Sequence, residues 1–249
     1  MEASKAIILN TFQVVFPEVN LYPRQIPVFR GAIAEWAGWD NDYFHNHLSE
    51  EQVVYRYPLI QYRSVEGRGC LYALQEGVTA LQQALFRPGD HCIESKEGAL
   101  NLNYYSISNQ QHELKLLDGW AVYYLNDWLA LNTDNYQKWK QNPRLMQRAM
   151  LLEEILAGHL LGFAAGIGWR LPERSIQVEV MDIYQQRKVK VHGADSIAFN
   201  IRYRANLLLP DDIGLGRSVS HGFGVQNKMR VRNKRAGKVT VDQLLQEVR

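Results

Sequence analysis

The chain has 249 residues, of which 46% are hydrophobic and 22% are charged, and its formal net charge is +2. This length permits one large domain or two of ordinary size, and the apolar content is enough for a packed core, which excludes a disordered chain. The protein is not basic throughout, but residues 226–249 contain seven basic and two acidic residues. A local patch of this kind can bind phosphates while the rest of the surface stays neutral.

Cysteine usage and hydropathy exclude several other classes. Cys70 and Cys92 lack CxxC spacing and neighbouring ligand residues, so they indicate neither a zinc site nor a disulfide framework, and we expect both to be small core residues. The N-terminus shows no signal-like apolar region, and residues 151–169 are interrupted by two glutamates, a histidine and four glycines. We therefore expect a cytoplasmic protein with no membrane partner, no metal and no other cofactor.

The first half of the chain alternates strand and helix patterns. Runs of β-formers, apolar residues at helical spacing and turn residues predict these elements in order: strand 5–16, helix 23–38, strands 53–64 and 69–74 joined by a turn at Glu66-Gly67, helix 78–86 and strand 91–94. This β-α-β-β-α-β order is that of the ferredoxin-like fold.

The second half partly repeats this order. The patterns predict extended, tyrosine-rich material at 103–131 with turns near Asn109 and Asp118-Gly119, helices over 133–166 interrupted by Pro143, a hairpin at 176–191 turning near Gln185-Gln186, and a strand at 197–209. His159 falls on an apolar helix stripe and is expected to be structural. We predict an α+β protein with tandem ferredoxin-like domains, at residues 1–97 and 98–249.

A glycine-rich stretch at residues 214–224, GLGRSVSHGFG, follows the last of these strands. Glycine allows positive φ and close approach to a ligand, and consecutive amides in such a turn can bind an anion. Neither the dinucleotide fingerprint nor the Walker loop is matched, whereas a basic run follows at once, which favours a nucleic-acid backbone over a single nucleotide. A glycine-rich hairpin followed by a solvated tail is the alternative. The predicted contacts are Gly214, Gly216, Arg217, Ser218, His221, Gly222, Gly224, Lys228, Arg230, Arg232 and Lys234.

The tripeptide His45-Asn46-His47 is a second candidate site, directly after the first predicted helix. Histidine titrates near neutral pH, so one ring can accept a proton while the other donates one. RNA cleavage requires such a base for the 2′-hydroxyl and such an acid for the 5′-oxygen. Ordinary surface histidines are the alternative, and a metal site would need further ligands that no nearby spacing supplies. The tripeptide is only a weak match to the metal-dependent HNH nucleases, whose name describes dispersed residues.

Two segments carry a resemblance to a known family. Residues 209–224 resemble the C-terminal glycine-rich signature of the CRISPR-associated repeat-RNA endoribonucleases of the RAMP superfamily. Residues 43–48 and 55–63 resemble the histidine-bearing segment of one branch of that family. The resemblance implies an endoribonuclease that binds CRISPR repeat RNA and cuts the precursor into guide crRNAs. It would act without metal, through attack of the 2′-hydroxyl, and leave a 2′,3′-cyclic phosphate.

The resemblance also implies roles for individual residues. His45 and His47 would be the catalytic pair, and Tyr55 the preferred hydroxyl. Many relatives have a lysine near this place, but this sequence has none between Lys5 and Lys96, so Arg30 or Arg56 would supply the cation. A non-catalytic RNA-binding subunit of a CRISPR effector complex is the alternative function. Subunits of such a complex and a second copy of this chain are further partners that the resemblance allows.

Overall fold

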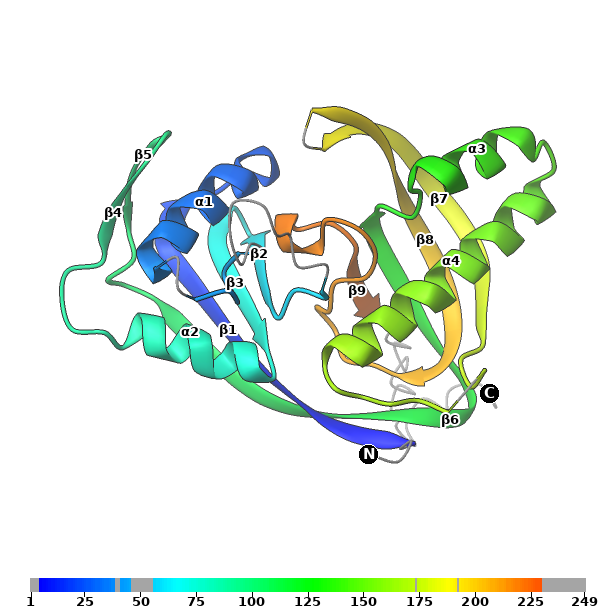
Figure 1. Ribbon diagram of the computed structural model, residues 1–249, viewed down its shortest axis with the longest axis horizontal. Helices are drawn as coiled ribbons and strands as arrows, with labels where there is room; N and C mark the ends of the chain where they lie inside the picture. The colour runs from blue at the N-terminus through cyan, green and yellow to red at the C-terminus, as the bar shows by residue number, and fades with distance from the viewer. Residues whose placement is uncertain (1–4, 39–40, 46–55, 173, 192, 230–249) are drawn as a thin grey trace, which may run out of the picture.

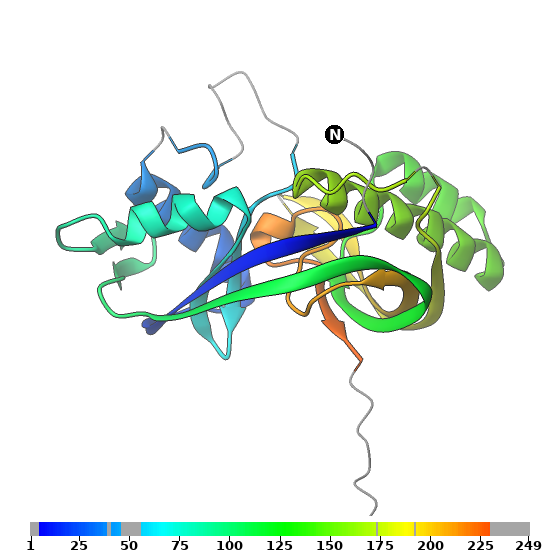
Figure 2. The ribbon, with the colours of Figure 1, turned by 90° about the horizontal axis from the view of Figure 1, so that it is seen from below.

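The computed structural model describes residues 5–38, 41–45, 56–172, 174–191 and 193–229. The described elements form a curved antiparallel sheet with helices packed against it (Figures 1 and 2). Their bounds are β1 (Ala6–Asn20), a short 3-10 turn η1 (Pro23–Gln25), α1 (Ile26–Ala37), β2 (Ile60–Val65), β3 (Arg68–Leu74), α2 (Glu76–Leu85), β4 (Cys92–Ser95), β5 (Gly98–Asn101), β6 (Ser106–Trp128), α3 (Thr133–Gln141), α4 (Leu145–Gly166), β7 (Val178–Val191), β8 (Ala194–Leu208), a second 3-10 turn η2 (Val219–His221) and β9 (Val225–Lys228).

The N-terminal unit has the strand order β2-β3-β1-β6. Strand β1 lies between β3 and β6, so that Val14 pairs with Leu71 on one side and Ile107 on the other. Alternate residues of β1, among them Phe12 and Val14, point toward α1 and α2 and are buried in one apolar cluster with them. This is the ferredoxin-like order, in which the first and third strands are central.

The C-terminal unit repeats that order as β9-β6-β8-β7. Helix α4 covers one face of it, where Leu152, Leu156 and Phe163 pack with Tyr203 in a second apolar cluster. Strand β6 belongs to both units, since its first part pairs with β1 and its last part with β9. Figure 2 shows β1 and β6 running together along the molecule. The predicted α+β class and tandem arrangement are confirmed, while the boundary near residue 97 stays a prediction.

Three predicted turns in the second half lie within continuous strands. Residues 106–128 form one strand, although turns were expected near Asn109 and Asp118-Gly119. Asn109 pairs regularly with Phe12, whereas Asp118-Gly119 falls in a register irregularity between Leu116 and Ala121. The hairpin expected to turn near Gln185-Gln186 is likewise the single strand β7, with an irregularity between Ile183 and Gln185. The residues at Asp118-Gly119 and next to Gln185 thus coincide with irregularities that bend a strand without ending it, whereas Asn109 has no effect on the pairing.

The strand predicted at 91–94 is present, but it lies outside the N-terminal sheet. It is β4, which pairs only with β5 in a separate two-stranded sheet beside α1 (Figure 1). The first part of β6 takes the fourth position in the N-terminal sheet instead. Cys70 is buried on β3 as expected, but the prediction of a core position for Cys92 is wrong. A two-stranded hairpin apart from the main sheet leaves one face in water, which exposes Cys92.

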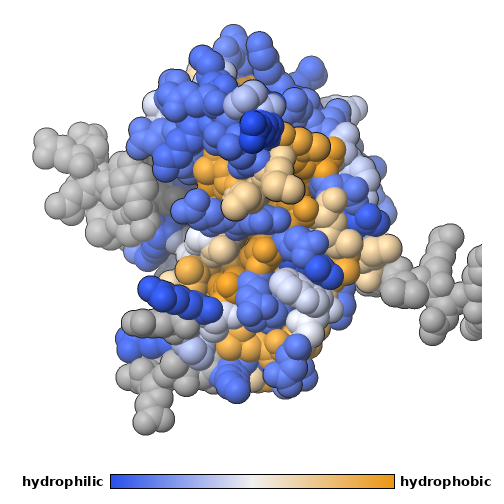
Figure 3. All heavy atoms as spheres, turned by 90° about the vertical axis from the view of Figure 1, so that its right-hand side faces the viewer, coloured by the Kyte–Doolittle hydropathy of each residue, from blue (hydrophilic) through white to orange (hydrophobic). Residues whose placement is uncertain are grey.

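Pro143 separates α3 from α4 as predicted. Helix α4 is long and apolar enough to cross a membrane by length and composition, a test that core helices also pass. One face of α4 lies in the C-terminal core, as described above. Its other face includes exposed Met146, Met150 and Leu161. Figure 3 views this end of the molecule and shows apolar residues interspersed with hydrophilic ones.

Candidate active site

The segment that carries the predicted histidines follows α1 closely. Gly38, with φ of +92°, ends the helix, and residues Asp42 to His45 form a turn and a bend. Phe44 is buried in the N-terminal core, and its carbonyl accepts a hydrogen bond of 2.9 Å from the Tyr62 hydroxyl on β2. His45 is only 5% exposed. His47 and Tyr55 lie outside the described residues, so their placement relative to His45 stays a prediction.

The two arginines proposed as the missing cation have different surroundings. Arg56 forms an ion pair of 3.0 Å with Asp42, donates to the Asp42 carbonyl and lies over the Tyr43 ring. The Asp42 carboxylate therefore neutralises the charge of Arg56. Arg30 on α1 lies 6.0 Å from the centre of the Tyr62 ring, and its buried Nε has no hydrogen-bond acceptor among the described residues. Of the two, Arg30 is the one whose charge is left for a ligand near Tyr62.

The glycine-rich loop is closely packed against protein. Gly216, Gly222 and Gly224 all have positive φ, as the glycine content predicted. A Cβ atom at Gly216 would lie 2.6 Å from the Trp128 ring, and one at Gly224 would lie 1.9 Å from the Leu215 carbonyl oxygen. At Gly222 it would meet Ile26 on α1 at 2.7 Å and the Tyr62 carbonyl oxygen at 3.3 Å. The packing of the loop against the protein therefore requires glycine at these positions.

The loop is attached to the C-terminal unit around Arg217. The Arg217 backbone N–H donates to the Leu129 carbonyl at 3.2 Å, and its guanidinium donates to the Leu131 carbonyl at 2.6 Å. His159 on α4 accepts a hydrogen bond of 3.1 Å from the Trp128 indole. Burial, and then the nearby Arg217 charge, lower the pKa of His159 to about 4, so its ring is neutral at pH 7. The structural role predicted for His159 is confirmed.

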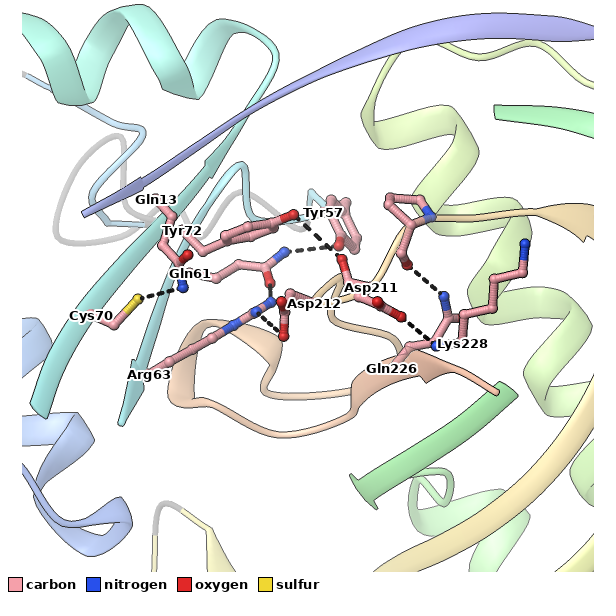
Figure 4. A network of polar contacts seen from close by, with 11 residues as sticks. Gln13, Tyr57, Gln61, Arg63, Cys70, Tyr72, Asp211, Asp212, Gln226 and Lys228 are labelled. Atoms are coloured by element: carbon pink, nitrogen blue, oxygen red, sulfur yellow. Dashed lines mark hydrogen bonds and ion pairs between the residues drawn. The ribbon is translucent and has the colours of Figure 1, made fainter. Parts of the chain in front are cut away.

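A buried polar chain attaches the same loop to the N-terminal unit (Figure 4). The Tyr57 hydroxyl donates to the Gly214 carbonyl at 2.8 Å and accepts from the Gln61 amide at 2.8 Å. The Gln61 carbonyl oxygen in turn accepts a bond of 2.5 Å from Arg63. Burial raises the pKa of Tyr57, so its hydroxyl keeps the proton that it donates. This chain holds the loop beside β2, the strand that follows the histidine-bearing segment.

Arg63 extends the chain to two residues that line a groove between the two units. It is 5% exposed, lies 4.4 Å from the Tyr72 ring centre and is 3.8 Å from the Asp212 carboxylate. Tyr72 and Asp212 line a groove of about 570 Å³. Sequence reasoning missed Tyr57, Gln61 and Arg63 as site-supporting residues. The available signal was the polar pair Gln61 and Arg63 at strand spacing within an apolar run, which is unusual for a buried strand.

Several predicted contact residues remain accessible to a ligand. Arg217 and Lys228 are exposed, and Ser218 and His221 are half-buried. The His221 ring is 3.3 Å from the Ser220 hydroxyl. Arg230, Arg232 and Lys234 lie outside the described residues. Within the part of the chain that the structure describes, no group of three or more His, Cys, Asp or Glu side chains is placed to hold a metal ion.

The fold and these attachments define a class of protein: two ferredoxin-like units with a glycine-rich loop packed between them. Comparison with known families gives the particular family. Residues 7–113 match the Cas6b N-terminal domain, and residues 115–229 match the Cas6b C-terminal domain. The chain belongs to the Cas6b family, which confirms the resemblance seen in the glycine-rich and histidine-bearing segments. The two matches meet within β6, the strand that both units share.

Solved Cas6b structures agree with this fold, and one curated relative matches part of the chain. A crystal structure of Cas6b, 22% identical, superposes with a TM-score of 0.78 over 90% of this chain and 100% of that chain. A Cas6b described as a CRISPR RNA processing endoribonuclease, 20% identical, gives 0.67 with the same coverage. An uncharacterised protein of Methanocaldococcus jannaschii is 31% identical over 101 residues, which are 41% of this chain and 67% of that protein. At these identities the structural matches establish the fold.

Proposed function

We propose that the protein is a metal-independent endoribonuclease that cuts CRISPR precursor RNA within its repeats and so produces guide crRNAs. Family membership supports this activity, since a structural relative is described as a CRISPR RNA processing endoribonuclease. The observation that carries the proposal is the meeting of the two predicted sites at Tyr62. Its hydroxyl holds the carbonyl next to His45, and its backbone oxygen lies 3.3 Å from the Cβ position of Gly222.

In this proposal His45 and His47 act as the acid–base pair. One takes the proton from the 2′-hydroxyl as its oxygen bonds to the adjacent phosphorus, and the other protonates the 5′-oxygen as the P–O5′ bond breaks. The products are a 2′,3′-cyclic phosphate and a 5′-hydroxyl end. Tyr55 supplies a hydroxyl to the site. Arg30 stabilises the charge that develops on the phosphate, because the Arg56 charge is matched by Asp42.

The glycine-rich loop and the basic residues beyond it bind the RNA backbone in the same proposal. Arg217, Ser218 and His221 contact phosphates or bases. Gly214 and Gly224 are buried, and the amides of Gly222 and Gly224 donate to the Val219 and Asp127 carbonyls, so Gly214, Gly216, Gly222 and Gly224 support RNA binding by shaping the loop. Lys228, Arg230, Arg232 and Lys234 contribute salt-sensitive phosphate contacts. Effector-complex subunits and a second copy of the chain are further partners, and the cytoplasm is the expected location.

The test is cleavage of repeat RNA by purified protein, with mapping of both new ends. We expect a cyclic phosphate and a 5′-hydroxyl at a single site, and equal rates with and without a chelator. A repeat with one 2′-deoxy nucleotide just before the cut should bind and resist cleavage. Efficient cutting of the deoxy substrate would contradict 2′-hydroxyl attack, and loss of activity with chelator would contradict metal independence. Binding of RNA without any cleavage would favour the alternative, a non-catalytic subunit of an effector complex.

A further inference from the structure

The C-terminal sheet has one face packed on α4 and one open face. Strand alternation separates them: Tyr123 and Tyr203 are buried in the core, whereas Tyr124 and Arg202 point the other way. The β6–β8 register pairs Tyr124 with Arg202 and Val122 with Arg204. Trp120 is on the same face, because the Arg204 guanidinium lies 4.7 Å from its ring centre. The open face therefore carries aromatic and arginine side chains on its two central strands.

Two of these aromatic side chains are exposed to solvent. Trp120 is 44% exposed, and Tyr184 on β7 is 57% exposed. Tyr184 lies 6.2 Å from Tyr124, ring centre to ring centre. Trp120 and Tyr124 are four residues apart on β6, which is about 13 Å along a strand. The face thus presents two separate aromatic positions, one at Trp120 and one at the Tyr124–Tyr184 pair.

The arginines of the open face are neutralised by acidic neighbours on β7. Arg204 pairs with Glu179, and Arg202 pairs with Asp182. These ion pairs fix the planar guanidinium groups beside the rings and make the centre of the face nearly neutral. Lys188 and Lys190, farther along β7, pair in register with Ile197 and Asp195 of β8. These alternate with the open-face residues and share the side of Phe199 and Ile201, so the two lysines do not add positive charge to the open face. Neutral rings held in place on a sheet face complement the bases of an unpaired nucleic-acid strand, which are flat and uncharged.

We propose that this open face binds unpaired nucleotides of RNA by stacking bases on Trp120 and Tyr184. In four-stranded sheets of this type that bind RNA, aromatic side chains on the sheet face stack two or three bases. The proposal takes RNA as the ligand from the proposed function, but the cleavage mechanism uses no residue of the open face. It adds a second contact region for single-stranded RNA next to the repeat.

The experiment measures binding of a short single-stranded RNA, and of the same RNA annealed to its complement, over a salt series. Trp120→Ala and Tyr184→Ala should each weaken single-strand binding by at least about fivefold, because a stacked base contributes roughly 1–3 kcal/mol. The slope against salt should not change, since neither substitution removes a positive charge. Duplex binding should be unaffected. Trp120→Phe should keep most of the affinity and lose the part of the RNA-induced change in tryptophan emission that comes from this residue.

Tyr136→Ala is the matched control. Tyr136 is 39% exposed on α3 and has Lys140 over its ring at 5.5 Å, but it is not on the open face. Wild-type affinity in both alanine variants, an equal loss in Tyr136→Ala, or a reduced salt slope would each overturn the proposal. Failure to bind single-stranded RNA would overturn it too. Because the readout is binding, these results are separate from the product ends that test the cleavage activity.

Discussion

The two ferredoxin-like units share a strand order but differ at one position. After β3 the N-terminal unit places the helix α2, whereas after β8 the C-terminal unit places the glycine-rich loop with the 3-10 turn η2 (Val219–His221). A helix satisfies its own backbone and covers the sheet, but the loop depends on contacts with both units. It is held by Trp128 and Leu131 on one side and by Tyr57 on the other. At the position where the N-terminal unit has a helix, the C-terminal unit therefore has a loop that lies between the units and depends on both.

The largest expected effect on stability comes from a substitution within the glycine-rich loop. Gly224→Ala places a Cβ atom 1.9 Å from the Leu215 carbonyl oxygen at a residue with φ of +69°. We expect a loss of about 2–5 kcal/mol in the free energy of unfolding, from overpacking together with backbone strain. Urea unfolding measures it. Gly158→Ala, on the exposed side of α4 with nothing within 4 Å, is the control and should stabilise by up to about 1 kcal/mol. Equal effects would mean that the loop is not tightly packed.

The attachment to the C-terminal unit should depend on pH through His159. Its pKa is about 4 in the folded protein and about 6.5 when unfolded, so the unfolded chain binds the proton first as pH falls. The stabilisation that neutral His159 gives to the folded protein is therefore fully present above pH 6.5. Between pH 6.5 and 4 the free energy of unfolding falls by about 2 kcal/mol, after allowance for the partial exposure of the ring. Unfolding free energies of wild type and His159→Gln over this range measure it. A parallel pH dependence in both proteins would contradict the assigned role.

The attachment of the loop to the N-terminal unit, through Tyr57, should contribute less to the free energy of unfolding. Tyr57→Phe removes the hydroxyl that donates to Gly214 and accepts from Gln61, which we expect to cost about 1 kcal/mol of unfolding free energy. Tyr22→Phe, at a tyrosine that is 62% exposed, should change nothing. Single-turnover cleavage should also slow in Tyr57→Phe, because the loop is less well held against the histidine-bearing segment. An unchanged rate and stability would show that this polar chain does not position the loop.

The smallest effect on the fold is expected from the basic residues after β9. Combined removal of charge at Arg230, Arg232 and Lys234 should leave stability unchanged, weaken RNA binding and reduce its salt slope by about one for each phosphate that the protein no longer neutralises. At saturating protein the cleavage rate should recover, because the histidines remain. Filter-binding titrations over a salt series measure the slope. The wild-type slope in this variant would indicate a solvated tail.

Local patterns predicted much of the fold and less of the site. Pro143 and Glu66-Gly67 predicted their breaks correctly, because a proline in a helix pattern and a positive-φ turn have local causes. Asp118-Gly119 and Gln185-Gln186 predicted turns where the strands are only irregular, because long pairing with β8 maintains the strand. The contacts of Tyr57 with Gly214 and of Arg63 with Asp212 join residues about 150 positions apart. No local pattern could indicate them.

The most direct test of the central claim compares the histidines of the N-terminal unit with the histidine of the glycine-rich loop. Single-turnover cleavage of repeat RNA is measured for His45→Ala, His47→Ala and His221→Ala, together with affinity and, for the buried His45, unfolding free energy. The account predicts rates about a hundredfold slower in the first two at nearly unchanged affinity, as loss of an acid or base produces. His221→Ala should bind less tightly and cleave normally when saturated. Near-normal rates in both His45→Ala and His47→Ala would contradict the assignment of the chemistry to the N-terminal unit.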